Sequence, residues 1–259
     1  LGTIAGSSKP TSGHSPNPRV GLPVDELDCS RQIAHFFLFE HDRRIVKQVG
    51  EDHYVRWMDD QNIGVKSHAE ARRVVNLLTR SLTEQRLTLN AGKTAFFEPA
   101  EVIVEFHLDV NKALTNWQRR WKKADTAKKK ERLSKILKKL WDAAPNKGQG
   151  HWEKVLKRFY GYVAVTQASW LDELAYEHLI QYPSLHQRLF ESFSKRGESE
   201  KLIGLMRRFV GEGECLYEAT EANLFDALLL VDADHKNESK CLSFAKDFLT
   251  EKIGKTSGK

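Results

Sequence analysis

The spacing of apolar residues changes near residue 115, and this change restricts the possible fold more than any other feature. Before it, short alternating segments and turn residues are mixed with helical patterns, as in structures that combine strands and helices. After it, apolar residues recur at helical intervals for the rest of the chain. The sequence therefore predicts an α+β fold: a mixed first part followed by an all-α second part.

The first part contains signals for two helices and several strands. Residues 30–48 are densely apolar without helix breakers and predict a buried helix. Two short strands at 53–58 and 61–65 are expected around an Asp59-Asp60 turn. Three further predicted segments are an amphipathic helix at 68–86, a strand, turn and strand at 87–97, and a half-buried strand at 102–110.

The second part is predicted to be a series of helices separated by glycines and one Tyr-Pro break. The predicted helices are 117–142, 151–166, 169–180, 184–195, 199–211, 221–231 and 239–253. At the other end of the chain, residues 1–20 are dominated by Gly, Ser, Pro and Thr and predict a loop or linker.

The net charge of +6 is distributed very unevenly. Residues 111–170 carry a net charge of +12, between slightly acidic segments on both sides. Basic segments of this kind contact nucleic acid or an acidic partner, or form a solvated helical face. Aromatic residues among the bases can stack on nucleotides or belong to the core, and Trp141 has the helical phase of core residues Leu133 and Leu137. The other interleaved aromatics are Trp117, Trp121 and Trp152.

Composition excludes several classes of protein. The longest apolar runs are too short to span a bilayer, so we expect no membrane segment. The three scattered cysteines indicate a reducing compartment such as the cytoplasm and no cysteine-based zinc site. The histidines show no metal-ligand spacing, and His35 and His41 are expected to be packing or surface residues.

The pair Asp59-Asp60 between two apolar segments is the most informative local feature. Adjacent carboxylates repel each other unless water or a cation compensates, and hard cations such as Mg²⁺ prefer carboxylate oxygens. Aspartate is also common in ordinary turns, so the pair alone allows a purely structural interpretation.

Two further motifs flank the acidic pair in a fixed order. The three motifs are Gly21-Leu22-Pro23-Val24 with Ser30-Arg31-Gln-Ile-Ala34, then Trp57-Met58-Asp59-Asp60, then Leu87-Thr-Leu-Asn90-Ala-Gly-Lys93-Thr94. Over about residues 19–98 this order resembles the second half of a reverse transcriptase palm domain. The resemblance implies a partial fingers and palm over 21–112, with antiparallel strands and helices, and an all-α helical thumb or C-terminal domain over 113–259.

Within that family, the chain is most similar to bacterial reverse transcriptases of phage defence and abortive infection. The Ser-Arg-x-x-Ala segment continues into Leu38-Phe-Glu40-His-Asp42, and the helical segments 181–189 and 223–229 resemble the C-terminal region of those enzymes. The resemblance implies RNA-directed DNA synthesis in antiviral defence. The implied partners are an RNA template, a DNA or protein primer, dNTPs and the N-terminal remainder of the polymerase, with no membrane; oligomerisation is left open.

The resemblance also implies roles for individual residues. Asp59 and Asp60 would bind two Mg²⁺ ions, with Mn²⁺ as a substitute, and Lys93 would stabilise or protonate the pyrophosphate. Trp57 would pack under the hairpin or lie near the primer end. The nucleotide or template side would be formed by Gly21, Pro23, Ser30 and Arg31. The expected phosphate contacts are Lys122, Lys123, Lys128, Lys129 and Lys130.

The chain departs from the family pattern at three places. Trp57 replaces the usual Tyr, and the acidic run 25–28 lies beside the implied nucleotide site. The family's first catalytic aspartate has no counterpart, because none of the first twenty residues is acidic. We therefore expect these 259 residues alone to be inactive. The alternative is a catalytically degenerate nucleic-acid-binding scaffold with a polymerase-like fold; an RNA-dependent RNA polymerase, which usually has Gly before Asp-Asp, fits less well.

Overall fold

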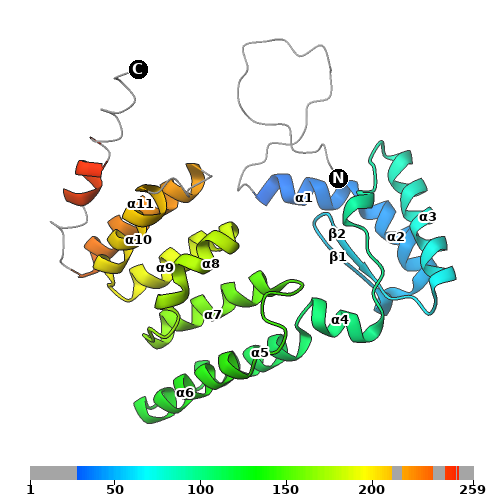
Figure 1. Cartoon of the computed structure of the whole chain (residues 1–259). Coiled ribbons are helices and arrows are strands. Elements are labelled where there is room, and N and C mark those ends of the chain that lie inside the picture. Colours follow the sequence, from blue (N-terminus) through cyan, green and yellow to red (C-terminus); the bar gives the residue numbers. More distant parts are fainter. Residues whose placement is uncertain (1–27, 212–217, 236–242, 249, 251–259) are drawn as a thin grey trace. The chain divides into compact units, whose positions relative to one another are not determined.

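The computed structural model describes residues 28–211, 218–235, 243–248 and 250. The chain forms two compact units, Leu1–Phe96 and Phe97–Lys259, and each is described by itself. The described residues are mostly helical and contain one two-stranded antiparallel sheet (Figure 1). This composition is broadly compatible with the α+β class. None of the described helices combines the length and apolar composition needed to cross a membrane.

The first unit is a β-hairpin packed with helices. Its described elements are α1 (Asp28–Phe37), α2 (Phe39–Val49), the 3₁₀ turn η1 (Glu51–His53), β1 (Tyr54–Trp57), β2 (Asp60–Ile63), α3 (His68–Glu84) and the 3₁₀ turn η2 (Ala91–Lys93). Helix α3 begins where the sequence supplies a cap, because the Ser67 hydroxyl accepts a hydrogen bond from the Glu70 backbone N–H at 3.2 Å.

The hairpin is positioned by the alternation of its side chains. Tyr54 pairs with Ile63 across the strands, and both side chains are half-buried and pack on the core of the unit. That core consists of Ile45 from α2 and of Val74 and Leu78 from α3. The predicted strand pair and the amphipathic helix at 68–86 are therefore confirmed to within two residues at each end.

The prediction of one buried helix at 30–48 is wrong. The segment forms two helices that meet at Leu38, and the side chains of Phe36, Phe37 and Phe39 are 81%, 50% and 57% exposed. On α2 only His41 and Ile45 are buried. An apolar residue becomes core only where a neighbour covers it, and the described residues of this unit leave these phenylalanines uncovered.

The two strand predictions after α3 are also wrong. Residues 87–97 contain the short turn η2 and no strand, because no described strand lies alongside to pair with them. Residues 102–110 alternate in polarity but form the end of α4 (Pro99–Glu105) and the start of α5 (Leu108–Lys122). Proline at the first helical position and the Glu101 carboxylate, which accepts from the Glu98 N–H at 2.7 Å, start a helix here.

The second unit is helical throughout its described residues. After α4 and α5 it contains α6 (Ala127–Ala143), α7 (Trp152–Thr166), η3 (Asp172–Leu174), α8 (Ala175–Gln181), η4 (Pro183–Leu185), α9 (His186–Lys195), α10 (Ser199–Gly211) and α11 (Glu218–His235). The predicted helix 117–142 is two helices, because the Thr126 hydroxyl caps a new one by accepting from the Lys129 N–H at 3.3 Å. The predicted helix at 239–253 lies partly outside the described residues; 243–248 are helical.

Helix α7 has the most extensively buried face among the described helices of this unit. It lies beside α9, which in turn lies beside α11 (Figure 1). Its residues Val155, Leu156, Phe159, Tyr160 and Val163 are fully buried in one continuous apolar core. The buried residues recur at helical spacing and form one broad apolar face of α7, while Glu153, Lys154 and Lys157 lie on its remaining surface.

We expect Phe159→Ala to destabilise the second unit by about 3–5 kcal/mol, because it removes a fully buried ring and leaves a cavity. Val165→Ala on the same helix is the control, since Val165 is 53% exposed and its truncation should cost less than about 0.5 kcal/mol. Urea denaturation followed by tryptophan fluorescence measures both, because five of the six tryptophans lie in this unit. Equal effects of the two substitutions would contradict this assignment of the core.

Candidate functional site

Asp59 and Asp60 lie at the exposed end of the β-hairpin. Trp57 pairs with Asp60, so the two-residue turn consists of Met58 and Asp59, and Asp60 is the first residue of β2. The predicted Asp59-Asp60 turn is thus displaced by one residue. Both carboxylates are exposed, and neither forms an ion pair with another described residue. Two adjacent carboxylates in this setting can bind a hard divalent cation.

The turn has an unusual backbone conformation. Met58 has a φ of 56°, in the region that non-glycine residues rarely adopt, and the neighbouring Asp59 does not share it. A positive φ at the first turn residue alone is the sign pattern of a type II′ hairpin turn, in which glycine is preferred. For a residue with a side chain this conformation costs about 1–3 kcal/mol, so the surrounding structure has to hold it.

An ion pair connects the hairpin to α2. The Arg56 guanidinium donates to both carboxylate oxygens of Asp42, from Nε at 2.7 Å and from Nη2 at 2.6 Å. The Arg56 side chain is 6% exposed and that of Asp42 is 23% exposed. Burial would raise the pKa of Asp42, but hydrogen bonds from Arg56 and Tyr54 outweigh it and hold that pKa below its ordinary value. The Asp42 carboxylate is therefore charged at neutral pH.

Polar groups around this ion pair are also connected to each other. The Tyr54 hydroxyl donates to Asp42 at 2.6 Å, and burial together with this hydrogen bond raises the pKa of Tyr54. The fully buried His41 ring lies within hydrogen-bond distance of Ser81 Oγ at 3.0 Å and of Gln61 Oε1 at 3.1 Å. This ring links α2 to α3 and to β2, so His41 is the packing residue that the sequence predicts.

The outer face of the hairpin is apolar and exposed. Val55 is 63% exposed and Trp57 is 77% exposed, because their side chains alternate with the inward-facing Tyr54 and Arg56. Trp57 therefore does not pack beneath the hairpin within the described residues. The Trp57 indole therefore lies accessible to solvent, beside its cross-strand partner Asp60.

The other residues predicted for the nucleotide site are only partly described. Gly21 and Pro23 lie outside the described residues. Ser30 and Arg31 belong to α1 by their backbone, but their side chains lie outside the described part. Lys93 is exposed at the end of η2, and no hydrogen bond or ion pair joins its side chain to the hairpin in the described residues. Among the described residues, no group of three or more His, Cys, Asp or Glu side chains could hold a metal ion.

The predicted phosphate contacts surround the junction of α5 and α6. Lys122 ends α5, Lys123 follows it, and all five lysines are exposed. Lys129 pairs with Asp125 at 2.8 Å, and Lys130 lies over the Trp121 ring at 5.9 Å. We call the exposed residues Lys122, Lys123, Lys128, Lys129 and Lys130 the lysine surface.

The tryptophans next to this surface mostly belong to the core. Trp117, Trp141 and Trp152 are each 8% exposed or less, and the Trp117 Nε1–H donates to the Leu133 carbonyl at 2.8 Å. Trp121 is half-buried and stacks on Trp117 with ring centroids 5.2 Å apart. Trp117 joins α5 to α6, and Trp141 of α6 packs against Trp152 of α7 with ring centroids 5.8 Å apart, so these rings do not stand free for stacking on bases.

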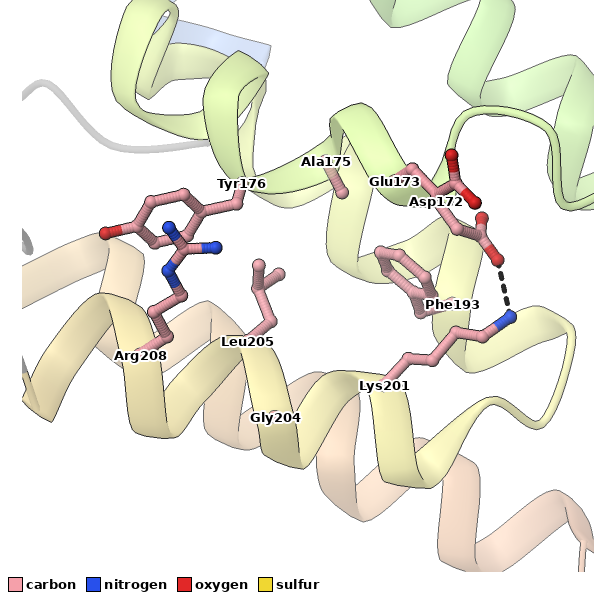
Figure 2. Close-up of a pocket in the computed structure, with 9 residues that line it drawn as sticks. All are labelled: Asp172, Glu173, Ala175, Tyr176, Phe193, Lys201, Gly204, Leu205 and Arg208. Atoms are coloured by element: carbon pink, nitrogen blue, oxygen red, sulfur yellow. Dashed lines mark hydrogen bonds and ion pairs between the residues drawn. The ribbon is translucent and has the colours of Figure 1, made fainter.

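Sequence reasoning missed a pocket of about 250 Å³ on the second unit (Figure 2). Its lining comes from η3, α8, α9 and α10, and such distant segments leave no motif. Asp172 at one end binds Arg196 at 2.7 Å and Lys201 at 2.7 Å. At the other end the Arg208 guanidinium lies 3.6 Å from the centre of the Tyr176 ring. These contacts bind α9 and α10 to η3 and α8.

Comparison with known proteins gives no match, whether to a family model, to a curated protein or to a solved structure.

We expect Asp42→Asn to lower the opening free energy of the first unit by about 3 kcal/mol at neutral pH, because it leaves the buried Arg56 charge without its counter-ion. Glu84→Gln is the control, since the Arg44–Glu84 pair is exposed and is worth less than about 1 kcal/mol. Hydrogen exchange of the α2 and α3 amides measures both.

The contribution of the Asp42 carboxylate to the stability of the first unit decreases as the pH is lowered. Since the pKa of Asp42 is lowered on folding, its contribution is fully present above the unfolded value near 3.8 and disappears as the pH falls below it. The unsubstituted chain should therefore lose stability relative to Asp42→Asn in that acidic range. A constant difference between the two chains would contradict the assignment.

Proposed function

We propose that this chain is the C-terminal part of an RNA-directed DNA polymerase that transfers nucleotides with two metal ions in antiviral defence. The observation that supports this best is the pair Asp59 and Asp60, exposed at the tip of an antiparallel β-hairpin, within the motif Trp57-Met58-Asp59-Asp60. The flanking Gly-Leu-Pro and Leu-x-Leu-Asn motifs support the same proposal.

Asp59 and Asp60 supply two of the carboxylates that a pair of Mg²⁺ ions would need. Asp59 and Asp60 offer hard oxygen ligands, and no described Lys or Arg side chain forms an ion pair with them. A third carboxylate outside this chain would complete the set of metal ligands. When bound, Mg²⁺ supplies the Lewis acidity that nucleotidyl transfer requires, and Mn²⁺ can substitute. In this proposal Asp59 and Asp60 hold their oxygens at the exposed end of the hairpin.

Other residues have proposed roles around the two carboxylates. Trp57 presents an exposed indole next to Asp60, suited to contact with a primer terminus. Lys93 would supply a positive charge to the leaving pyrophosphate. Ser30, Arg31 and the Gly21-Leu-Pro23 turn would border the nucleotide and template.

A second proposed function is a nucleic-acid-binding scaffold without chemistry. The observation in its favour is the lysine surface, which is exposed in the second unit and needs no catalytic group to bind phosphates. The two functions share this surface and differ in the need for Asp59 and Asp60.

Primer extension separates them. We expect the complete protein to incorporate nucleotides in a Mg²⁺-dependent manner, and Asp59→Ala with Asp60→Ala to reduce the rate at least about a hundredfold, because metal ligands supply most of the stabilisation of the transferring phosphoryl group. Glu51→Ala with Asp52→Ala, two exposed acids before β1, should leave the rate unchanged. Activity retained by the Asp59/Asp60 variant would exclude the catalytic assignment, and binding without any incorporation would favour the scaffold.

The lysine surface predicts a specific salt dependence. A plot of log affinity against log salt concentration has a negative slope. The triple variant Lys122→Gln, Lys128→Gln and Lys130→Gln should make this slope shallower by up to about three for duplex nucleic acid, about 0.9 for each phosphate that a lysine no longer neutralises. Arg188→Gln, Lys195→Gln and Lys201→Gln remove the same charge from α9 and α10 and should leave the slope unchanged. Fluorescence anisotropy at several salt concentrations measures this. Equal slopes in the two triple variants would show that the lysine surface is only solvated.

A further inference from the structure

The turn that presents the two carboxylates has a conformation that its sequence disfavours. Met58, immediately before Asp59, has a φ of 56° although it carries a side chain. Residues in this region persist when contacts around them compensate, and they are concentrated at functional sites. A contact with the turn is therefore needed to hold Met58 in this conformation.

Arg56 makes that contact. Its Nη1 donates to the Met58 carbonyl oxygen at 2.8 Å. Its other two nitrogens donate to Asp42, so all three guanidinium nitrogens are engaged. Because the side chain is 6% exposed, water does not compete effectively for these hydrogen bonds.

The other side of the contact is anchored in the core of the first unit. Asp42 lies on α2 between the buried residues His41 and Ile45, and its carboxylate also accepts from the Tyr54 hydroxyl at 2.6 Å. The pKa of Arg56 is raised by the hydrogen bonds from its guanidinium to Asp42, so the guanidinium remains charged. A chain of contacts therefore runs from the helix core through Asp42 and Arg56 to the carbonyl that precedes Asp59.

We propose that Arg56 is a positioning residue that holds the acidic turn and thereby keeps Asp59 and Asp60 in place for cation binding. The effect of Arg56 on catalysis rests on the proposed function. Its effect on the turn is a property of the fold and can be measured separately.

Lysine at position 56 distinguishes positioning from simple charge pairing. A lysine ammonium keeps the positive charge beside Asp42 but lacks the planar fork that reaches both the carboxylate and the Met58 carbonyl. Arg56→Lys should therefore preserve most of the ion pairing while releasing the turn. Arg44→Lys is the matched control, because Arg44 on α2 also pairs with a carboxylate, that of Glu84, and no hydrogen bond joins it to the hairpin in the described residues.

Two readouts test the proposal. In hydrogen exchange of the 259-residue chain, Arg56→Lys should speed exchange at residues 58–61 about tenfold or more, with less change in α2 and α3. In primer extension by the complete protein, the Mg²⁺ concentration for half-maximal rate should rise about tenfold, with partial rescue by excess Mg²⁺ or Mn²⁺. Arg44→Lys should change neither. Exchange and metal dependence that both match those of Arg44→Lys would overturn the proposal.

A second variant covers the case in which Arg56→Lys weakens the whole first unit. Glycine adopts a positive φ without a clamp, so in a Met58→Gly background the exchange effect of Arg56→Lys at the turn should fall to less than half. Equal effects in both backgrounds would mean that Arg56 only supports the fold, and would overturn the positioning role. If the unsubstituted complete protein incorporates no nucleotide, the proposed function fails, while the exchange comparison still decides whether Arg56 holds the turn.

Discussion

The buried ion pair between Arg56 and Asp42 is the contact on which the candidate site depends. A guanidinium with 6% exposure needs a counter-ion and partners for its N–H groups, and α2 and the hairpin turn supply both. The pair sets how β1 lies on α2, because a shift of one residue would bury Trp57 and expose the charge. With Arg56 directed inward, Trp57 lies on the outer face, and Asp59 and Asp60 are left at the exposed tip.

The second unit is held together by a different interaction. Its stability comes from apolar side chains around α7, and the lysines that its basic segment, residues 111–170, places on α5 and α6 stay in water. The tryptophans that interleave with the lysines are mostly committed to this core, with Trp117 bonded to a backbone carbonyl of α6. Binding of nucleic acid by the lysine surface would therefore be mainly electrostatic, and strongly dependent on salt.

The sequence predicted an element correctly where the signal lies within that element or its immediate flanks. The strands of the hairpin alternate and flank an acidic turn, and α3 follows a serine cap, so both appear close to their predicted bounds. Residues 102–110 also alternate, yet a proline and Glu101 begin a helix just before them and no described strand is available as a partner. Alternation alone predicts a strand only when a partner strand exists. The phenylalanines of 36–39 show the same limit, since composition cannot show whether a neighbour covers them.

From the sequence alone follow the α+β class, the helical character of the second part, the acidic pair at a strand hairpin, and the basic segment that contains the lysine surface. These depend on periodicity and composition, which are local quantities. Only the tertiary structure showed that Arg56 reaches Asp42 and the Met58 carbonyl, that His41 joins two helices and a strand, and that the tryptophans are core. Arg56 and Asp42 lie on different elements, and whether two such side chains meet depends on how α2 packs against β1, which no local pattern records.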